Sequence, residues 1–445
     1  MIRSVSNDRK EIVELSLNLS ANFNDKSNSN GTALFVAVEK RASEQTALIR
    51  AVSNGHKEIV ELLLKSDAKV NAKSNYDRTA LFVAIEKYYE DIAEILLTYN
   101  VDVIAKTTYG ETALIMAVKR GYVNIVYILL QKNVSVNVQA WDGYSALIEA
   151  ASNGQKEIVQ LLIDYKADIN AKTITNTTAL INAAHNGYEE IVDLLLQSNV
   201  DINAETEIGL TALTMAASSG HKEIVKLLLQ NNLTTASKQL ALFSAVTNGF
   251  KEIVKLLLDS NTNVNAKFFS DHTALFVAIE KGHQEIAKLI LKYNVDINAK
   301  TRYEETALIE AVKKGYVEIV EILLQKDANI NAQAWGGFSA LIIAASTGRK
   351  QIVKLLLEYG ANVNATSKMN TTSLIYAAQN GHKEIVGLLL ESNASVNAKT
   401  ETGETALMKA SLNGHKEVVE LLLQYYHNHV IKDPDITIMF LRHYY

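Results

Sequence analysis

Hydrophobic and polar positions along this chain follow one phrase that returns many times. A start similar to Thr-Ala-Leu-Ile is followed nine residues later by Gly, and then by a run similar to Glu-Ile-Val-x-Leu-Leu-Leu. The phrase has a period of 33 residues, and only the step from Thr211 to Leu240 is shorter, at 29. A fixed period of this size is typical of repeat proteins, in which each unit buries its apolar face against its neighbours. The first residues of the phrase are Thr46, Thr79, Thr112, Ser145, Thr178, Thr211, Leu240, Thr273, Thr306, Ser339, Thr372 and Thr405.

Each phrase predicts a pair of short helices joined by a tight turn. A threonine or serine precedes the first helix, where its hydroxyl can accept a hydrogen bond from an unpaired N–H of the first turn. Glycines such as Gly55 and Gly121 follow the first helix, where a left-handed backbone costs little without a Cβ. The second helix, for example residues 57–65, is too apolar for one solvated face, so a neighbouring repeat must cover it. In a central second helix we expect Leu161 to be a core position.

The 33-residue unit, its cap, its turn glycine and the closing Val-Asn-Ala of residues 70–72 resemble the ankyrin repeat. The family opens its repeat with Thr-Pro-Leu-His, whereas Ala47 and Ile49 stand here in the places of Pro and His. Because Ala is the best helix former, the fold should survive the first change. The resemblance covers roughly residues 1–424. It implies an all-α ankyrin-repeat solenoid with β-hairpin fingers, about 12 repeats long, with partial repeats at the N-terminus.

A longer periodicity divides the array into parts. Residues 42–433 consist of two copies of one block offset by 194 positions, as in Ala140-Trp141 and Ala334-Trp335. We therefore predict truncated repeats at 1–45, a first six-repeat block at 46–239, a second block at 240–424 and a C-terminal cap or tail at 425–445. Because the short step falls at the junction of the blocks, we predict a missing or stunted finger within residues 231–239.

Two places break the pattern of the first block. The N-terminal segment places two first helices in succession, with no Gly or Pro after Gly31 until Gly55. This arrangement predicts either one long helix over residues 33–54 or a fault in the stacking. Tyr88 stands where the other repeats have the turn glycine, and we expect a distorted turn there. We interpret both features as drift rather than chemistry.

Composition narrows the range of partners and locations. A net charge of −5 gives no general attraction to nucleic-acid phosphates or anionic membranes. The absence of cysteine excludes disulfides, thiol catalysis and cysteine-ligated metal. No run of about 18 apolar residues and no signal peptide is found. We therefore expect a monomer in the cytoplasm, or a protein exported into a host cell by a non-classical route.

The sequence offers no catalytic constellation. Five histidines occupy the same repeat position after the turn glycine, so we interpret them as structural: His56, His221, His283, His382 and His415. The pair His427 and His429 lacks an evident third metal ligand, and neither Gly-rich phosphate loops nor a Ser/His/Asp arrangement is present. We therefore expect a protein that is not an enzyme and binds no cofactor or metal.

What remains is a surface for binding other proteins. In the ankyrin family, the finger tips and the exposed side of the first helices line a concave groove that selects the partner. The resemblance implies that aromatic and basic residues at these positions bind, because such residues dominate binding hot spots. The candidates are Tyr76, Tyr109, Lys119, Arg120, Trp141 and Tyr144 in the first block, and Phe269, Tyr303, Lys313, Lys314, Trp335 and Phe338 in the second.

The leading hypothesis is a non-catalytic scaffold that binds one or more partner proteins in this groove. The Lys-, Asn- and Ile-rich composition of the repeats resembles that of ankyrin-rich proteins from AT-rich intracellular bacteria, amoebae and large viruses. This resemblance implies a host-directed role. One alternative is a regulatory ankyrin subunit of an enzyme that acts in trans, and another is a degenerate array without a current partner. The exposed aromatic residues can also serve simply to pack one finger against the next.

Overall fold

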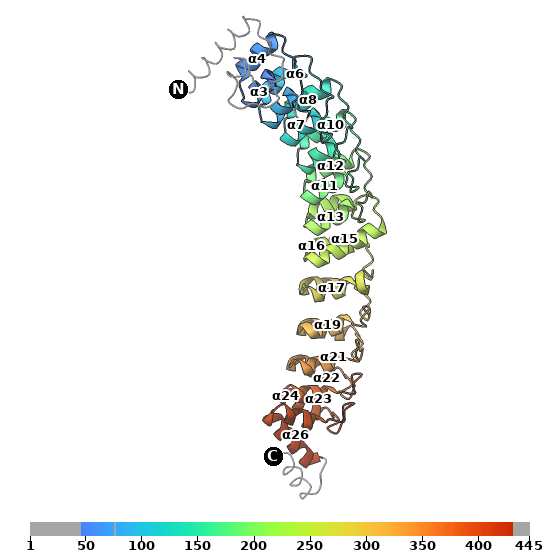
Figure 1. Cartoon of the computed structure of the whole chain (residues 1–445). Coiled ribbons are helices and arrows are strands. Elements are labelled where there is room, and N and C mark those ends of the chain that lie inside the picture. The colour runs from blue at the N-terminus through green and yellow to red at the C-terminus, as the bar shows by residue number, and fades with distance from the viewer. Residues whose placement is uncertain (1–45, 75–76, 430–445) are drawn as a thin grey trace. The chain divides into compact units, whose positions relative to one another are not determined.

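The computed structural model describes residues 46–74 and 77–429 (Figure 1). Internal contacts divide the chain into two compact units, Met1–Ser237 and Lys238–Tyr445, called unit 1 and unit 2 below. The predicted four-part division of the chain stays a prediction. The expected helical fold is confirmed, because each described repeat is a first helix and a second helix joined by a tight turn.

Unit 1 contains six helix pairs in its described part. Each first helix packs against its own second helix and against the neighbouring first helices, as α11 does between α9 and α13. The first helices are α3 Ala47–Ser53, α5 Ala80–Glu86, α7 Ala113–Arg120, α9 Ala146–Ser152, α11 Ala179–Asn186 and α13 Ala212–Ser219. The second helices are α4 Lys57–Lys65, α6 Glu90–Leu97, α8 Val123–Gln131, α10 Lys156–Asp164, α12 Glu189–Leu196 and α14 Lys222–Leu229.

Unit 2 has the same layered plan, and Figure 1 shows its finger loops along one edge of the helices. A short helix, η1 Phe269–Asp271, forms one finger tip. The first helices are α15 Thr235–Asn248, which begins at the end of unit 1, α17 Ala274–Glu280, α19 Ala307–Lys314, α21 Ala340–Ser346, α23 Ser373–Gln379 and α25 Ala406–Leu412. The second helices are α16 Lys251–Asp259, α18 Gln284–Ile290, α20 Val317–Gln325, α22 Lys350–Glu358, α24 Lys383–Glu391 and α26 Lys416–His429.

The predicted helix caps are confirmed at nearly every described repeat. Thr112 has an extended backbone, and its hydroxyl accepts a hydrogen bond from the N–H of Ile115 at 3.3 Å. Thr79 is an exception, because its buried hydroxyl has no partner. Thr46 also caps its helix with an extended backbone, so one continuous helix over residues 33–54 is wrong. The alternative, a stacking fault in the N-terminal segment, lies outside the described residues.

In several repeats the side chain of the residue after the turn glycine binds the preceding repeat. His221 Nε2 lies 2.9 Å from the carbonyl oxygen of His185, at the end of the preceding first helix. Its ring lies on Gly187, where an added Cβ would come within 2.5 Å of the ring. The glycine is therefore required both by its left-handed backbone, with φ of 85°, and by the ring above it. Three further histidines make the same bond, which confirms their structural role: His283, His382 and His415.

Asparagines of the closing Val-Asn-Ala and related segments form a second link between repeats. The Asn170 side-chain oxygen accepts a hydrogen bond from the backbone N–H of Asp201, 31 positions later, at 2.7 Å. Asn298 accepts from Asn329 in the same way at 2.7 Å. Where this asparagine is present, one repeat thus fixes the loop of the next one.

The fingers differ from the predicted β-hairpins. The described residues contain no β-strand; four fingers instead close with a single antiparallel bridge, such as the one between Lys106 and Thr112. The tips bond to each other along the array. The backbone N–H of Trp141 donates to the carbonyl oxygen of Tyr109 at 3.1 Å, and the backbone N–H of Ile174 donates to the carbonyl oxygen of Asp142 at 3.2 Å. Each hairpin ends at this bridge because the first helix begins directly after it, as α7 does at Ala113.

The short step of 29 residues removes one finger, as predicted. Helix α15 has 14 residues and begins at Thr235, so it includes positions that form a finger elsewhere. Thr234 caps it, because its hydroxyl accepts from the N–H of Ser237 at 3.2 Å. Leu240 consequently lies inside the helix instead of at its cap.

The expected distortion at Tyr88 is wrong. Tyr88 adopts φ of 64°, close to the 83° of its counterpart Gly282 in the second block. The next N–H, from Tyr89, reaches the oxygen of Ala84 at 3.0 Å, as in the glycine turns. The turn keeps its form. Tyr88, a bulky residue, is held in the left-handed region, which strains its backbone.

The core positions of the second helices also differ by one residue from expectation. Leu162 is fully buried in α10, whereas Leu161 is half-buried. We therefore expect Leu162→Ala to destabilise the surrounding repeats by about 2 to 5 kcal/mol, through lost burial and a cavity. Leu161→Ala is the matched control with a smaller loss. Hydrogen exchange of the α10 and α12 amides measures both, and equal losses would contradict the assignment.

We expect Tyr88→Gly to stabilise its repeat by about 1 kcal/mol. It relieves a backbone strain of about 1 to 3 kcal/mol and loses a contact with Arg120 that is worth about 0.5 to 1 kcal/mol. The mirror change Gly282→Tyr should destabilise, since a Cβ there would lie 3.1 Å from the Tyr316 hydroxyl. Amide exchange in α5 and α6, or in α17 and α18, reports each effect. A loss of protection in Tyr88→Gly would show that the tyrosine contacts outweigh the strain.

Candidate functional site

A cavity of about 210 Å³ lies between the fingers and first helices of unit 1. Three predicted residues line it: Tyr109 from a finger tip, and Lys119 and Arg120 from the last turn of α7. The finger leads directly into α7, and Lys119 lies two helical turns after its cap, so it returns to the finger side. The surface made by the fingers around Tyr109 and Trp141 and by this last turn of α7 is called the finger face below.

Tyr109 and Trp141 form an exposed aromatic pair on the finger face. Their ring centroids are 6.4 Å apart in an edge-to-face arrangement, with an interplanar angle of 72°. Gly110 allows this contact, because a Cβ there would lie 2.8 Å from the Trp141 ring. Trp141 remains 75% exposed and Tyr109 62% exposed. The rings therefore do pack finger against finger, yet most of their area still faces solvent.

Ion pairs surround the cavity. Lys119 Nζ lies 2.6 Å from Glu111 Oε1, and Arg78 Nη1 lies 2.6 Å from Glu86 Oε2. Burial lowers the pKa of Lys119, but the hydrogen bond and the charge of Glu111 outweigh it, so the net pKa is raised. Lys119 is consequently a cation whose charge is largely neutralised by Glu111 within the site.

Arg120 is positioned by Tyr88, which sequence reasoning assigned to drift. The guanidinium carbon lies 4.3 Å from the centroid of the Tyr88 ring, and Nη1 donates a hydrogen bond to the Tyr88 hydroxyl. Tyr88 in turn meets the ring of Tyr122 edge-on, with centroids 6.5 Å apart. In the described residues Arg120 forms no ion pair with a carboxylate. The signal for this contact was present in the sequence as a tyrosine in place of a turn glycine.

The other candidates of the first block do not join the cavity. Tyr144 is half-buried at the base of its finger, where its N–H donates to Asp142 Oδ1 at 3.0 Å, and it does not line the cavity. Tyr76 lies outside the described residues.

In unit 2 the corresponding residues lie at the finger tips, directly before α21 and on α19. Trp335 is 74% exposed and lines a cavity of about 440 Å³ together with Glu304 and Lys368. Phe338 is half-buried, with its ring 5.9 Å from Tyr376, and Phe269 lies exposed on η1. Tyr303 is exposed at its own finger tip, where its carbonyl oxygen accepts a hydrogen bond from the backbone N–H of Trp335 at 3.0 Å.

The two copies differ by a buried carboxylate, which is present only in the second block. Glu310 on α19 stands where the first block has Met116, which lines the unit 1 cavity. Lys313 and Lys314 lie 3.8 and 3.7 Å from it, and Lys313 also pairs with Glu305. Burial raises the pKa of Glu310, while the two lysines act in the opposite direction. Lys314 is thus paired with a carboxylate of its own helix, whereas its counterpart Arg120 lies on an aromatic ring.

Two searches of the structure were negative over the residues that it describes. Within 46–74 and 77–429, no group of three or more His, Cys, Asp or Glu residues is arranged to hold a metal ion. Over the same ranges, no helix is both long and apolar enough to cross a membrane.

The comparison with known families covers almost the whole chain. A family model described as ankyrin repeats (three copies) matches seven overlapping stretches, 1–107, 99–173, 139–206, 180–268, 242–334, 299–367 and 341–433. No curated protein matches the sequence. The capped helix pairs, the left-handed turns and these matches agree, and the chain belongs to the ankyrin-repeat family.

Proposed function

We propose that this protein is a non-catalytic scaffold that binds a partner protein on the finger face of unit 1. Ankyrin repeats are in general protein–protein interaction modules and typically have no catalytic role. The family therefore supports the class of function. The choice of surface rests on this chain's own residues.

The exposed Tyr109–Trp141 pair is the observation that carries the proposal. The two rings pack against each other and the backbones of their finger tips are bonded, so part of the ordering that binding requires is already in place. Rigid aromatic side chains with large exposed area are typical binding hot spots. Patches of exposed apolar surface rimmed by polar residues also mark interaction sites.

Arg120 supplies the polar part of this surface. Its stacking on Tyr88 orients the guanidinium, and in the described residues no carboxylate neutralises it. A partner that places an aliphatic or aromatic side chain against Trp141 and a carboxylate or carbonyl near Arg120 would satisfy both groups. Unit 2 offers less, because Lys314 lies beside the buried Glu310.

The setting of this activity belongs to the proposal as well. We place the scaffold inside a cell, either in the cytoplasm or in a host cell after non-classical export, and as a monomer. The resemblance of the repeats to those of host-directed arrays supports the second setting. Regulation of an enzyme in trans would be a special case in which the bound partner is that enzyme.

We expect the double variant Arg120→Ala, Trp141→Ala to lose its partner in affinity capture by at least about tenfold relative to the intact chain. Each hot-spot residue contributes about 2 kcal/mol or more to binding, and tenfold corresponds to about 1.4 kcal/mol. Capture from source and host lysates, quantified by mass spectrometry, measures the change. Protection of the Tyr109 and Trp141 fingers from hydrogen exchange, with the purified partner bound, then locates the site.

The matched control is Tyr127→Ala, which removes a part-exposed aromatic residue from second helix α8 of the same unit. It should capture the partner like the intact chain. Identical and unselective captures by all three proteins would overturn the proposal and favour an array without a partner. A captured enzyme whose activity changes on binding would identify the scaffold as a regulatory subunit.

A further inference from the structure

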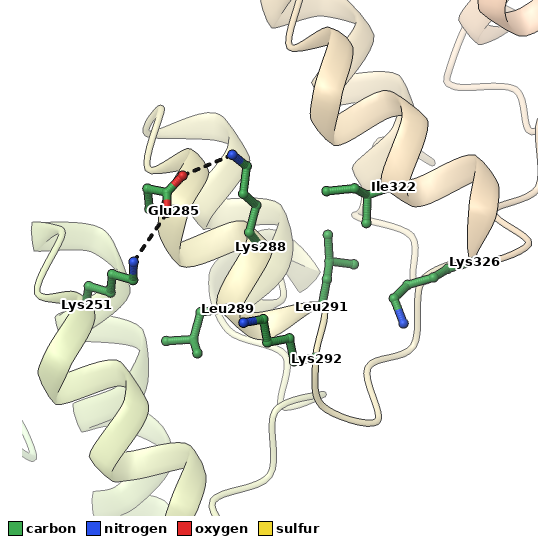
Figure 2. A pocket seen from close by; sticks show the side chains of 8 residues that line it. All are labelled: Lys251, Glu285, Lys288, Leu289, Leu291, Lys292, Ile322 and Lys326. Carbon is green, nitrogen blue, oxygen red and sulfur yellow. Dashed lines mark hydrogen bonds and ion pairs between the residues drawn. The ribbon is translucent and has the colours of Figure 1, made fainter.

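A notch interrupts the row of second helices in unit 2. Helix α18 has seven residues and ends at Ile290, whereas its neighbours α16 and α20 have nine. A cavity of about 350 Å³ opens beside the shortened end, between α18 and α20 (Figure 2). This site lies on the second helices and is separate from the finger face.

The floor of the notch is apolar. Leu289 and Leu291 come from the end of α18, and Ile322 comes from the middle of α20. Figure 2 shows Leu291 pointing toward Ile322 across the notch. Leu289 and Ile322 are only half-buried, so the floor keeps apolar area that a ligand can cover.

Four lysines surround this floor: Lys251, Lys288, Lys292 and Lys326. Two of them are paired. Lys251 and Lys288 reach Glu285 at 3.3 and 3.0 Å, and Lys288 also reaches Glu318 at 2.8 Å. Lys292 and Lys326 are exposed and form no ion pair within the described part of the chain. The rim therefore has four lysines and two carboxylates, which leaves two positive charges without a neutralising partner among the described residues.

The internal duplication supplies a reference for this rim. The equivalent positions of the first block, 194 residues earlier, keep the apolar floor as Ile95, Leu97 and Ile128. Glu94 and Thr98 stand there in place of Lys288 and Lys292. With Lys57 and Lys132 against Asp91 and Glu94, that rim is balanced. The two copies thus keep the same apolar positions and differ in the charges around them.

We propose that the notch of unit 2 docks an acidic peptide segment of a partner protein, with aliphatic side chains on the apolar floor and carboxylates facing Lys292 and Lys326. Charge complementarity selects an acidic occupant. The apolar floor favours a peptide over a nucleic acid, because the lining offers no aromatic ring for base stacking. The cavity also falls within the range of about 300 to 1,000 Å³ that is usual for ligand sites.

The test uses the full chain and a fluorescein-labelled peptide of alternating Glu-Glu and Leu-Leu pairs, with binding followed by fluorescence anisotropy. The variant Lys288→Glu, Lys292→Thr installs the residues that the first block carries at the same places. It should weaken binding by about tenfold or more, because it removes one cation from the rim and reverses the charge of another. The reverse variant Glu94→Lys, Thr98→Lys should create a second site of similar affinity in unit 1.

Controls separate the proposal from simple attraction of anions. A peptide with Gln in place of Glu, an all-Glu peptide and single-stranded DNA should all bind much more weakly than the Glu-Leu peptide. Equal binding of the all-Glu peptide or of DNA would overturn the proposal, as would unchanged affinity in the Lys288→Glu, Lys292→Thr variant. Trp141→Ala should leave the peptide affinity unchanged, and a loss there would place the peptide on the finger face instead. The reverse variant in unit 1 keeps the test decisive even if the unit 2 variant folds poorly.

Discussion

The register between neighbouring repeats is the constraint on which the rest of the structure depends. It is set by side chains that bind the backbone of the adjacent repeat, as Asn170 binds the N–H of Asp201 and His221 binds the carbonyl of His185. These bonds satisfy backbone groups at loop and helix ends that would otherwise lack partners. Such bonds recur at most of the described repeats, and the finger tips come within bonding distance of one another. The contact between Tyr109 and Trp141 lies at one such pair of bonded tips.

The sequence was most informative where a residue type in a given context has one main structural role. A threonine before an apolar run is a cap, and a glycine after it is a left-handed turn, and both predictions are confirmed. Tyr88 shows where this reasoning fails. The rule that bulky residues avoid positive φ considers the backbone alone, whereas the ring of Tyr88 gains contacts with Arg120 and Tyr122 from the next repeat. Contacts between repeats are not visible in a local pattern.

The remaining errors also have physical causes. A hydrophobic run such as that of α10 does not say which of two adjacent leucines faces inward, since one residue turns the helix by about 100°. Leu162 rather than Leu161 is the buried one. The fingers are hairpins that close with a single bridge, such as the one at Lys106 and Thr112, because helix α7 begins directly after Thr112. At the candidate site, Tyr109, Lys119 and Arg120 line one cavity, while Tyr144 does not line it.

The two blocks show why fold and binding chemistry separate in this chain. The asparagine positions that hold the register are mostly filled alike in both copies, as in Asn71 and Asn265, which bind the N–H of Asp102 and Asp296, although Ile104 corresponds to Asn298. Positions outside these links are free of that constraint, and there Met116 corresponds to Glu310 and Glu94 to Lys288. A change at such a position leaves the bonds between repeats intact but alters charge and shape on the surface. A repeat array can therefore acquire a new binding surface at little cost to its stability, provided that the new side chains leave the links between repeats untouched.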